Sequence, residues 1–399
     1  MRSKNQSWRY SLAATVLLLS PFDLLASLGM DMYLPVVPFM PDALGTTEET
    51  VQLTLTAYLV LIGAGQLLFG PLSDRLGRRP VLLAGGVAFS VASIGLAIAS
   101  SAELFLGLRI VQACGASACL VAMFATVRDI YAGRDEINVI YGLLGSMLAI
   151  VPAVGPLLGT LVDSWLGWRA IFALLGIGMI ATCLVAWRFW AETRTQRAQG
   201  LQYSKLLIPM KRLNFWLYTL CYSAGMGSFF VFFSTAPQLM MARQGVSKLS
   251  FSLLFSTVAI AMMGTARIMG RLIPRWGSLN TLRMGMGCLM AGSSFLAMGE
   301  LWAPSSVLGF IAPMWLVGVG VATAVSVAPN GALRGFDHIA GAVTAVYFCL
   351  GGLLLGSIGT IIIFLLPSGT AWPVVAYCMT LAIVVLGLSF IKSARHHRG

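Results

Sequence analysis

The hydrophobic pattern of this chain consists of long apolar runs separated by short polar stretches. A helix that spans a bilayer needs about 20 mostly apolar residues, and lipid cannot satisfy free backbone groups, so such runs predict helices rather than loops. We predict twelve spanning helices at 10–36, 51–71, 81–100, 103–126, 138–162, 169–190, 214–237, 250–269, 281–300, 305–328, 340–366 and 372–391. The first run continues past Asp23 toward Val37, so we expect a span there and not a cleaved signal peptide.

Positive charge is distributed unevenly over the polar stretches between these runs. With a cytoplasmic N-terminus, only Arg169, Arg243 and Lys248 of the 26 Lys and Arg residues fall on the outer side, and Arg109 lies within a span. Cytoplasmic loops carry such an excess of Lys and Arg. We therefore expect both termini in the cytoplasm. The net charge of +12 then reflects topology and indicates no nucleic-acid partner.

Composition supports the membrane class. Hydrophobic residues make up 58% of the chain and charged residues 10%, whereas a soluble domain carries about 25% charged residues. The seven cysteines lie in apolar runs without metal-ligand spacing, and only three histidines are present. We therefore expect no metal and no cofactor. An enzyme site of clustered His, Cys or acidic residues is not visible, and neither is a polar filter loop typical of a channel.

The polar stretch 192–212 divides the chain into halves, and a short sequence pattern of the first half is repeated in the second. Gly70–Arg79 reads GPLSDRLGRR, and Gly270–Gly277 reads GRLIPRWG, so Gly, Leu, Arg and Gly recur at a shift of 200 residues. Duplicated helical repeats produce such symmetry. We predict an all-α membrane protein with two pseudo-symmetric six-helix bundles, 1–191 and 213–399, joined by a cytoplasmic linker.

Four features inside the spans are candidates for function, three of them polar. Asp23 and Asp31 are the acids placed well inside a span, about 80° and 12 Å apart on one helix. Arg109, Gln112 and Gly115 share one face of the fourth span. The fifth span contains the run 152–159, PAVGPLLG, and this pattern favours a bent, tightly packed helix. Buried ionisable groups in a membrane are functional candidates.

Together these motifs resemble the major facilitator superfamily. The loop Gly70–Arg79 resembles its loop signature, the fourth span its arginine signature and the fifth span its antiporter signature, which favours export. The run Asp23–Pro38 is similar to the bacterial chloramphenicol and florfenicol exporters among its drug:proton antiporters. The similarity extends to Trp168–Phe172, Phe229–Phe233 and Ser326–Leu333. The second-half loop departs from the signature, because Pro274 stands where Asp74 stands in the first half.

The resemblance implies proton-coupled efflux of phenicol antibiotics, chloramphenicol first and florfenicol second, across the bacterial inner membrane. It implies a central cavity lined by the first, fourth, seventh and tenth helices. The implied partners are a small-molecule drug, protons and the lipid bilayer, with a monomeric protein. The proton-coupling residues are then Asp23, Asp31 and Arg109. The expected drug contacts are Asp23, Tyr33, Arg109, Gln112, Met123, Phe229, Phe230 and Phe233. The expected gating and motif residues are Gly70, Asp74, Arg75, Gly77, Arg78, Pro152, Gly155 and Pro156.

Several alternatives remain open from the residues themselves. Arg109 is also consistent with a structural arginine that binds backbone carbonyls of a neighbouring helix. Asp23 is consistent with a packing hydrogen bond and Asp31 with an interfacial cap, and the run 229–233 is consistent with core packing. A broader multidrug antiporter and a proton-coupled importer of a small metabolite remain alternative functions, although the fifth-span pattern counts against import.

Overall fold

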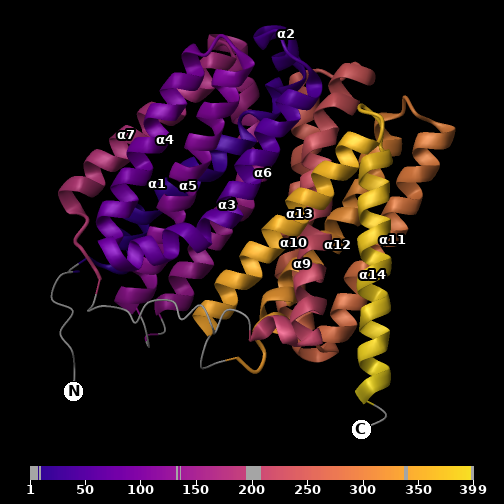
Figure 1. Cartoon of the computed structure of the whole chain (residues 1–399). Coiled ribbons are helices and arrows are strands. Elements are labelled where there is room, and N and C mark those ends of the chain that lie inside the picture. Colours follow the sequence, from indigo (N-terminus) through magenta and orange to yellow (C-terminus); the bar gives the residue numbers. More distant parts are fainter. Residues whose placement is uncertain are drawn as a thin grey trace. The chain divides into compact units, whose positions relative to one another are not determined.

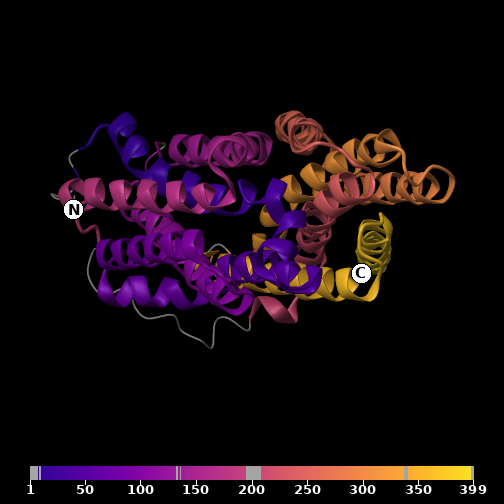
Figure 2. The same ribbon diagram turned by 90° about the horizontal axis from the view of Figure 1, so that it is seen from above.

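The computed structural model describes residues 8, 10–131, 134, 136–194, 208–336 and 340–396. These residues are largely α-helical and include no β-strand, which confirms the all-helical prediction. The chain divides into two compact units, unit 1 from Met1 to Leu201 and unit 2 from Gln202 to Gly399. Figures 1 and 2 show unit 1 in indigo to magenta and unit 2 in rose to yellow.

Unit 1 contains six long helices among its described residues. They are α1 (Leu12–Asp31), α3 (Glu48–Leu76), α4 (Arg78–Ile98), α5 (Ala102–Tyr131), α6 (Glu136–Leu166) and α7 (Trp168–Phe189). A 3₁₀ segment, η1 (Leu34–Phe39), and the short α2 (Met40–Leu44) follow α1. The run that we predict as one span over 10–36 therefore changes from α-helix to 3₁₀-helix after Asp31, and Leu12–Leu44 remains one candidate span. Pro35 and Pro38 account for the change, because proline disfavours helical backbone at the preceding residue.

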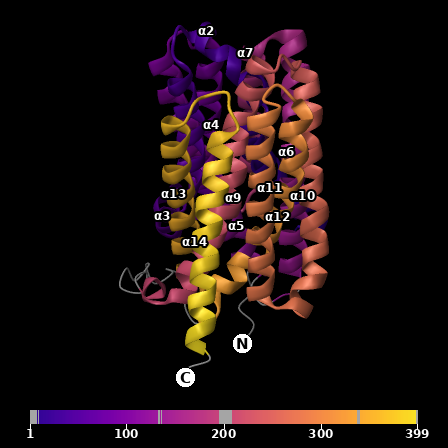
Figure 3. The ribbon, with the colours of Figure 1, turned by 90° about the vertical axis from the view of Figure 1, so that its right-hand side faces the viewer.

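Unit 2 also contains six long helices in its described part. They are α9 (Leu213–Pro237), α10 (Lys248–Trp276), α11 (Ser278–Trp302), α12 (Val307–Leu333), α13 (Ala340–Leu365) and α14 (Trp372–His396). The 3₁₀ turn η2 (Pro209–Lys211) precedes α9, and the π-helical segment η3 (Gln238–Arg243) extends it. Figure 3 shows α14, in yellow, running alongside α11.

Ten of the described helices are long and apolar enough to cross a membrane, and α6 adds a shorter apolar stretch, Ile150–Leu166. Polar residues mark several helix starts. Ser11, Thr47, Ser247 and Ser306 each accept a backbone N–H from the first turn of the helix that follows. Such capping satisfies donors that a helix leaves free at its N-terminus.

The two units repeat one pattern of helix pairing. In unit 1, α4 packs on α5 and α7, α3 packs on α5, and α1 packs on α5, α6 and α7. In unit 2, α11 packs on α12 and α14, α10 packs on α12, and α9 packs on α12, α13 and α14. Each helix of unit 1 thus has a counterpart with equivalent neighbours in unit 2. In each unit the first helix, α1 or α9, contacts three others and is largely enclosed.

Candidate functional site

Arg109 lies in the interior of unit 1, on α5, with no exposed surface. Its Nη1 donates to the backbone carbonyl of Gly29 on α1 at 2.8 Å and to Oε1 of Gln112 at 2.7 Å. Gln112 lies one helical turn further on, and its Nε2 donates to the Ser93 hydroxyl on α4 at 2.8 Å. One charged side chain and its neighbour therefore connect α5 to α1 and α4.

Aromatic rings surround the Arg109 guanidinium. Its Cζ lies 4.5 Å from the ring centroid of Tyr58, 4.9 Å from that of Tyr33 and 5.8 Å from that of Phe172. Tyr58 is held in place because its hydroxyl donates to the carbonyl of Ala26 at 2.6 Å. Ring faces attract a desolvated cation. Nε and Nη2 of Arg109 have no hydrogen-bond partner among the described residues, so two of its three guanidinium nitrogens remain unpaired.

Asp23 and Asp31 both lie on α1 and are almost completely buried, with 2% and 7% of their surfaces exposed. Neither carboxylate forms a hydrogen bond or an ion pair with a residue that the structure describes. We expect from the sequence that Arg109 lies nearer to Asp31 than to Asp23. Its observed contact on α1 is Gly29, two residues before Asp31, and it is a contact to the backbone. The structural alternative for Arg109 is therefore observed, without an ion pair to either acid.

The glycines of α6 contact α1 where α1 ends. A Cβ atom on Gly155 would lie 2.5 Å from Cβ of Asp31, and one on Gly159 would lie 2.0 Å from the carbonyl oxygen of Met32. Only glycine permits so close an approach of two helices. Pro152 and Pro156 lie in the same helix, on either side of Gly155. The fifth-span motif thus packs directly against the second acid of α1.

The loop between α3 and α4 carries a charge network. Arg78 is buried, and its guanidinium forms ion pairs with Asp74 at 2.5 Å and with Asp129 of α5 at 2.7 Å. Glu192, which follows α7, accepts the backbone N–H groups of Arg78 at 2.9 Å and Arg79 at 3.1 Å. These are the first N–H groups of α4, where a carboxylate is favourable. The network joins α3, α4, α5 and the segment after α7.

Comparisons with known proteins agree with these features. The family description of the Major Facilitator Superfamily matches residues 23–360. The chain belongs to the major facilitator superfamily. It is therefore a multi-pass membrane transporter and not an enzyme.

Two curated relatives and one solved structure are similar to this chain over most of its length. It is 79% identical to the "Chloramphenicol resistance protein" of Pseudomonas aeruginosa over 399 residues, which are 100% of this chain and 95% of that protein. It is 29% identical to "Multidrug resistance protein D" of Escherichia coli K12 over 335 residues, 82% of each chain. A crystal structure of a POT family transporter in complex with 5-aminolevulinic acid matches with a TM-score of 0.72 at 13% identity, covering 96% of this chain and 95% of that one. This last likeness shows the fold alone.

The remaining predicted residues of unit 1 are placed as follows. Tyr33 joins the Arg109 cluster, and Met123 is fully buried in α5. The backbone carbonyl of Arg75 accepts a hydrogen bond from Arg194. A Cβ atom on Gly70 would meet nothing within 4 Å, so no described residue packs closely on this glycine. Gly77 is different, because a Cβ atom there would lie 2.5 Å from Oε2 of Glu192.

The phenylalanine side chains of residues 229–233 in unit 2 do not line one continuous surface. Phe230 is 2% exposed and packs against Gly359 of α13. Phe232 stacks on Phe255 of α10 at 4.9 Å, and Phe233 contacts the same ring edge-on at 5.9 Å. Phe229 alone of the four keeps part of its surface open. The core-packing alternative is therefore observed for most of the run.

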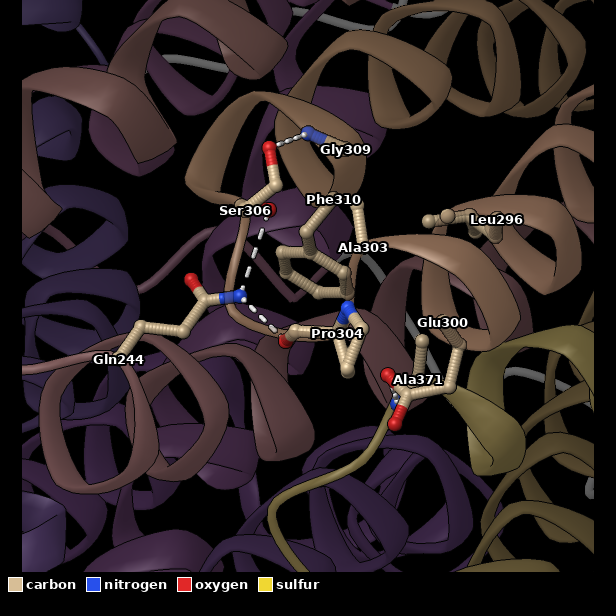
Figure 4. A pocket seen from close by; sticks show the side chains of 10 residues that line it. Gln244, Leu296, Glu300, Ala303, Pro304, Ser306, Gly309, Phe310 and Ala371 are labelled. Carbon is tan, nitrogen blue, oxygen red and sulfur yellow. Dashed lines mark hydrogen bonds between the residues drawn. The ribbon is translucent and has the colours of Figure 1, made fainter.

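One cavity in the described part of unit 2 is too small to hold a drug. Figure 4 shows it between Gln244, Glu300, Ser306 and Ala371, and its volume is about 10 Å³. An ion pair of 2.6 Å joins Arg243 to Glu300 nearby. A wider hollow of about 580 Å³ lies between α11 and α12, but it is lined by apolar side chains such as Phe295 and Leu308. Drug sites contain a few well-placed polar groups, which this hollow lacks.

Sequence reasoning missed four residues of the site, namely Tyr58, Ser93, Asp129 and Glu192. Tyr58 and Ser93 carried no signal, because a lone hydroxyl in an apolar run is usual. Glu192 did carry a signal in the sequence, because it is the only acidic residue in the basic stretch 192–212. Most of that predicted linker, residues 195–207, lies outside the described residues.

Proposed function

We propose that this transporter exports chloramphenicol and related phenicols from bacteria in exchange for protons, by alternating access. The observation that carries the proposal is the 79% identity, along the whole chain, to the chloramphenicol resistance protein of P. aeruginosa. The fifth-span glycine motif, packed on Asp31, supports export as the direction. Susceptibility of cells that lack their own pumps, with and without this protein, tests the proposal: resistance to chloramphenicol should appear and should vanish with a protonophore.

We further propose that the transporter has twelve spanning helices in two six-helix bundles, 1–191 and 213–399, joined by the linker 192–212. The repeated helix pairing within each unit supports this arrangement. The distribution of Lys and Arg supports cytoplasmic termini in the bacterial inner membrane. We propose a monomer, since each unit has its own core.

Proton coupling is assigned to Asp23 and Asp31, with Arg109 beside them. A carboxylate inside a membrane protein is costly when it is ionised and unpaired. Both acids are buried and lack a partner among the described residues, so a proton or a drug group that hydrogen-bonds to them has a favourable place to bind. The unpaired donors of Arg109 offer the complementary contact for a drug carbonyl or hydroxyl. Drug and proton then compete for the same buried groups.

The test of coupling is Asp23→Asn, which keeps the size of the side chain and removes its titration. We expect drug-driven proton movement in reconstituted vesicles to be abolished at normal expression. Asp42→Asn is the matched control, because Asp42 is an exposed acid of unit 1 on α2, and it should leave transport unchanged. Full activity of Asp23→Asn would remove this residue from the mechanism. Drug movement without a pH gradient and with both acids neutralised would refute proton coupling itself.

A broader multidrug antiporter is a second candidate, favoured by the similarity to multidrug resistance protein D of E. coli. The same cells distinguish the two when they are exposed to cationic and neutral drugs in parallel. Resistance confined to phenicols supports the first proposal, and resistance to several classes supports the second.

A further inference from the structure

Helix α9 of unit 2 keeps one narrow face open. Between Cys221 and Pro237 every residue is buried except Tyr222, Met226 and Phe229. Their spacing of four and three residues places them on one face of the helix. The helix packs against α12, α13 and α14, and Tyr222 and Phe229 themselves each contact a ring, on α13 and on α10, while keeping part of their surface open. Two aromatic rings and an adaptable thioether thus form the open face of an otherwise enclosed helix.

Tyr222 on this face belongs to a cluster of three rings. Its centroid lies 5.2 Å from that of Tyr347 and 5.7 Å from that of Phe348, both on α13. Tyr347 and Phe348 are 5.0 Å apart. Gly351 makes room for the cluster, because a Cβ atom there would lie 2.7 Å from the Tyr222 ring. Rings at these distances and angles form a stable aromatic surface.

The Tyr347 hydroxyl of this cluster lacks a hydrogen bond, a state that it shares with the buried Tyr33 hydroxyl of unit 1 among the described tyrosines. Tyr347 has no exposed surface, and its hydroxyl has no hydrogen-bond partner among the described residues. Elsewhere the buried hydroxyl of Tyr58 donates to the Ala26 carbonyl, and that of Tyr377 donates to the Ser223 carbonyl at 2.9 Å. A buried donor without an acceptor is unfavourable, and a protein that retains one invites a functional explanation.

We propose that Tyr222 and Tyr347 are drug-contact residues of unit 2: the Tyr222 ring stacks on the aromatic ring of a phenicol, and the Tyr347 hydroxyl donates a hydrogen bond to an oxygen of the drug. The inference rests on the proposed function and adds residues that the motifs did not indicate. Phenicols suit this site because they are neutral and combine one flat ring with acceptor oxygens. Met226 and Phe229 extend the apolar surface along the same face of α9.

Tyr347→Phe tests the proposal, because it removes one hydroxyl and keeps the ring. Loss of an unsatisfied donor should leave the thermal stability of the purified protein unchanged or higher. Loss of the contact to the drug should raise the KM for chloramphenicol about 3- to 10-fold in vesicles. A role in packing alone would not separate these two readouts in this way.

Tyr377→Phe is the matched control, since it removes a buried hydroxyl that is hydrogen-bonded on the same unit. It should lower thermal stability and leave the KM unchanged. An unchanged KM in Tyr347→Phe, while the unaltered protein transports chloramphenicol, would overturn the role of the tyrosines and leave the proposed function intact. An unaltered protein that transports no chloramphenicol would overturn the proposed function, and the present inference with it.

Discussion

Two loops, one between α3 and α4 and one between α10 and α11, have a similar backbone turn but different side-chain contacts. In each, one glycine separates two helices with a positive φ, 111° at Gly77 and 77° at Gly277. The glycine N–H bonds the carbonyl four residues earlier in both loops, at 3.1 Å to Ser73 and 2.9 Å to Ile273. The repeated turn is therefore a property of the glycine and the helix end.

The side chains around these two turns differ completely. Beside Gly77, Glu192 fills the space, and Arg78 connects Asp74 to Asp129. Beside Gly277 a Cβ atom would meet nothing within 4 Å, and Pro274 and Ser278 stand where Asp74 and Arg78 stand. Among the residues that the structure describes, the unit 2 loop forms no ion pair, so the turn does not require one. The ion pairs of Arg78 and the hydrogen bonds of Glu192 in unit 1 instead connect the ends of several helices.

The largest expected effect follows from Arg78→Ala. The change leaves two partly buried carboxylates without their shared cation, and breaking such a pair costs about 3 kcal/mol. We expect a clear fall in thermal stability and loss of drug efflux. Arg275→Ala in the other loop is the control, because Arg275 is exposed, and it should change stability by less than about 0.5 kcal/mol. Equal losses in the two variants would show that the loops do not differ as described.

A smaller effect is expected from alanine at the two turn glycines. A positive φ combined with a ψ near 155° is essentially restricted to glycine, so alanine is unfavourable at both positions by about 1–3 kcal/mol. Gly77→Ala also forces Glu192 away from the start of α4, so it should lose more stability than Gly277→Ala. Thermal unfolding of the two purified variants measures the difference. If both variants melt at the same temperature, Glu192 contributes nothing through this contact.

The smallest effect is expected when the charges are transplanted. Pro274→Asp combined with Ser278→Arg places an acid and an arginine at the equivalent positions of unit 2. An exposed pair four residues apart contributes only about 0.3–0.5 kcal/mol, and no described residue of unit 2 takes the place of Asp129 or Glu192 around it. Thermal stability should differ from that of the Pro274→Ala, Ser278→Arg control by no more than this amount. A gain of several kcal/mol would mean that the pair alone, without its surroundings, stabilises the unit 1 loop.

More of the fold than of the candidate site could be predicted from the sequence. Apolar runs of span length identify helices without knowledge of their neighbours, and a lone arginine in such a run already indicates a buried charge. The partner of Arg109 could not be predicted, because the Gly29 carbonyl is available only where α1 and α5 meet. The choice between drug contact and core packing for the phenylalanine run could not be made from the sequence for a related reason. Helical spacing shows that Phe230 and Phe232 point in different directions, but it does not show which direction is the core.

The close contact of α6 with α1 limits which positions of this transporter can change in sequence during evolution. Positions 155 and 159 have no room for even one methyl group, so mutation there moves a whole helix away from Asp31 and Met32. Val154 and Leu158, their neighbours on the same helix, are exposed and can exchange for other apolar residues. Natural variants under antibiotic selection should therefore diverge on one side of this helix and stay unchanged on the other.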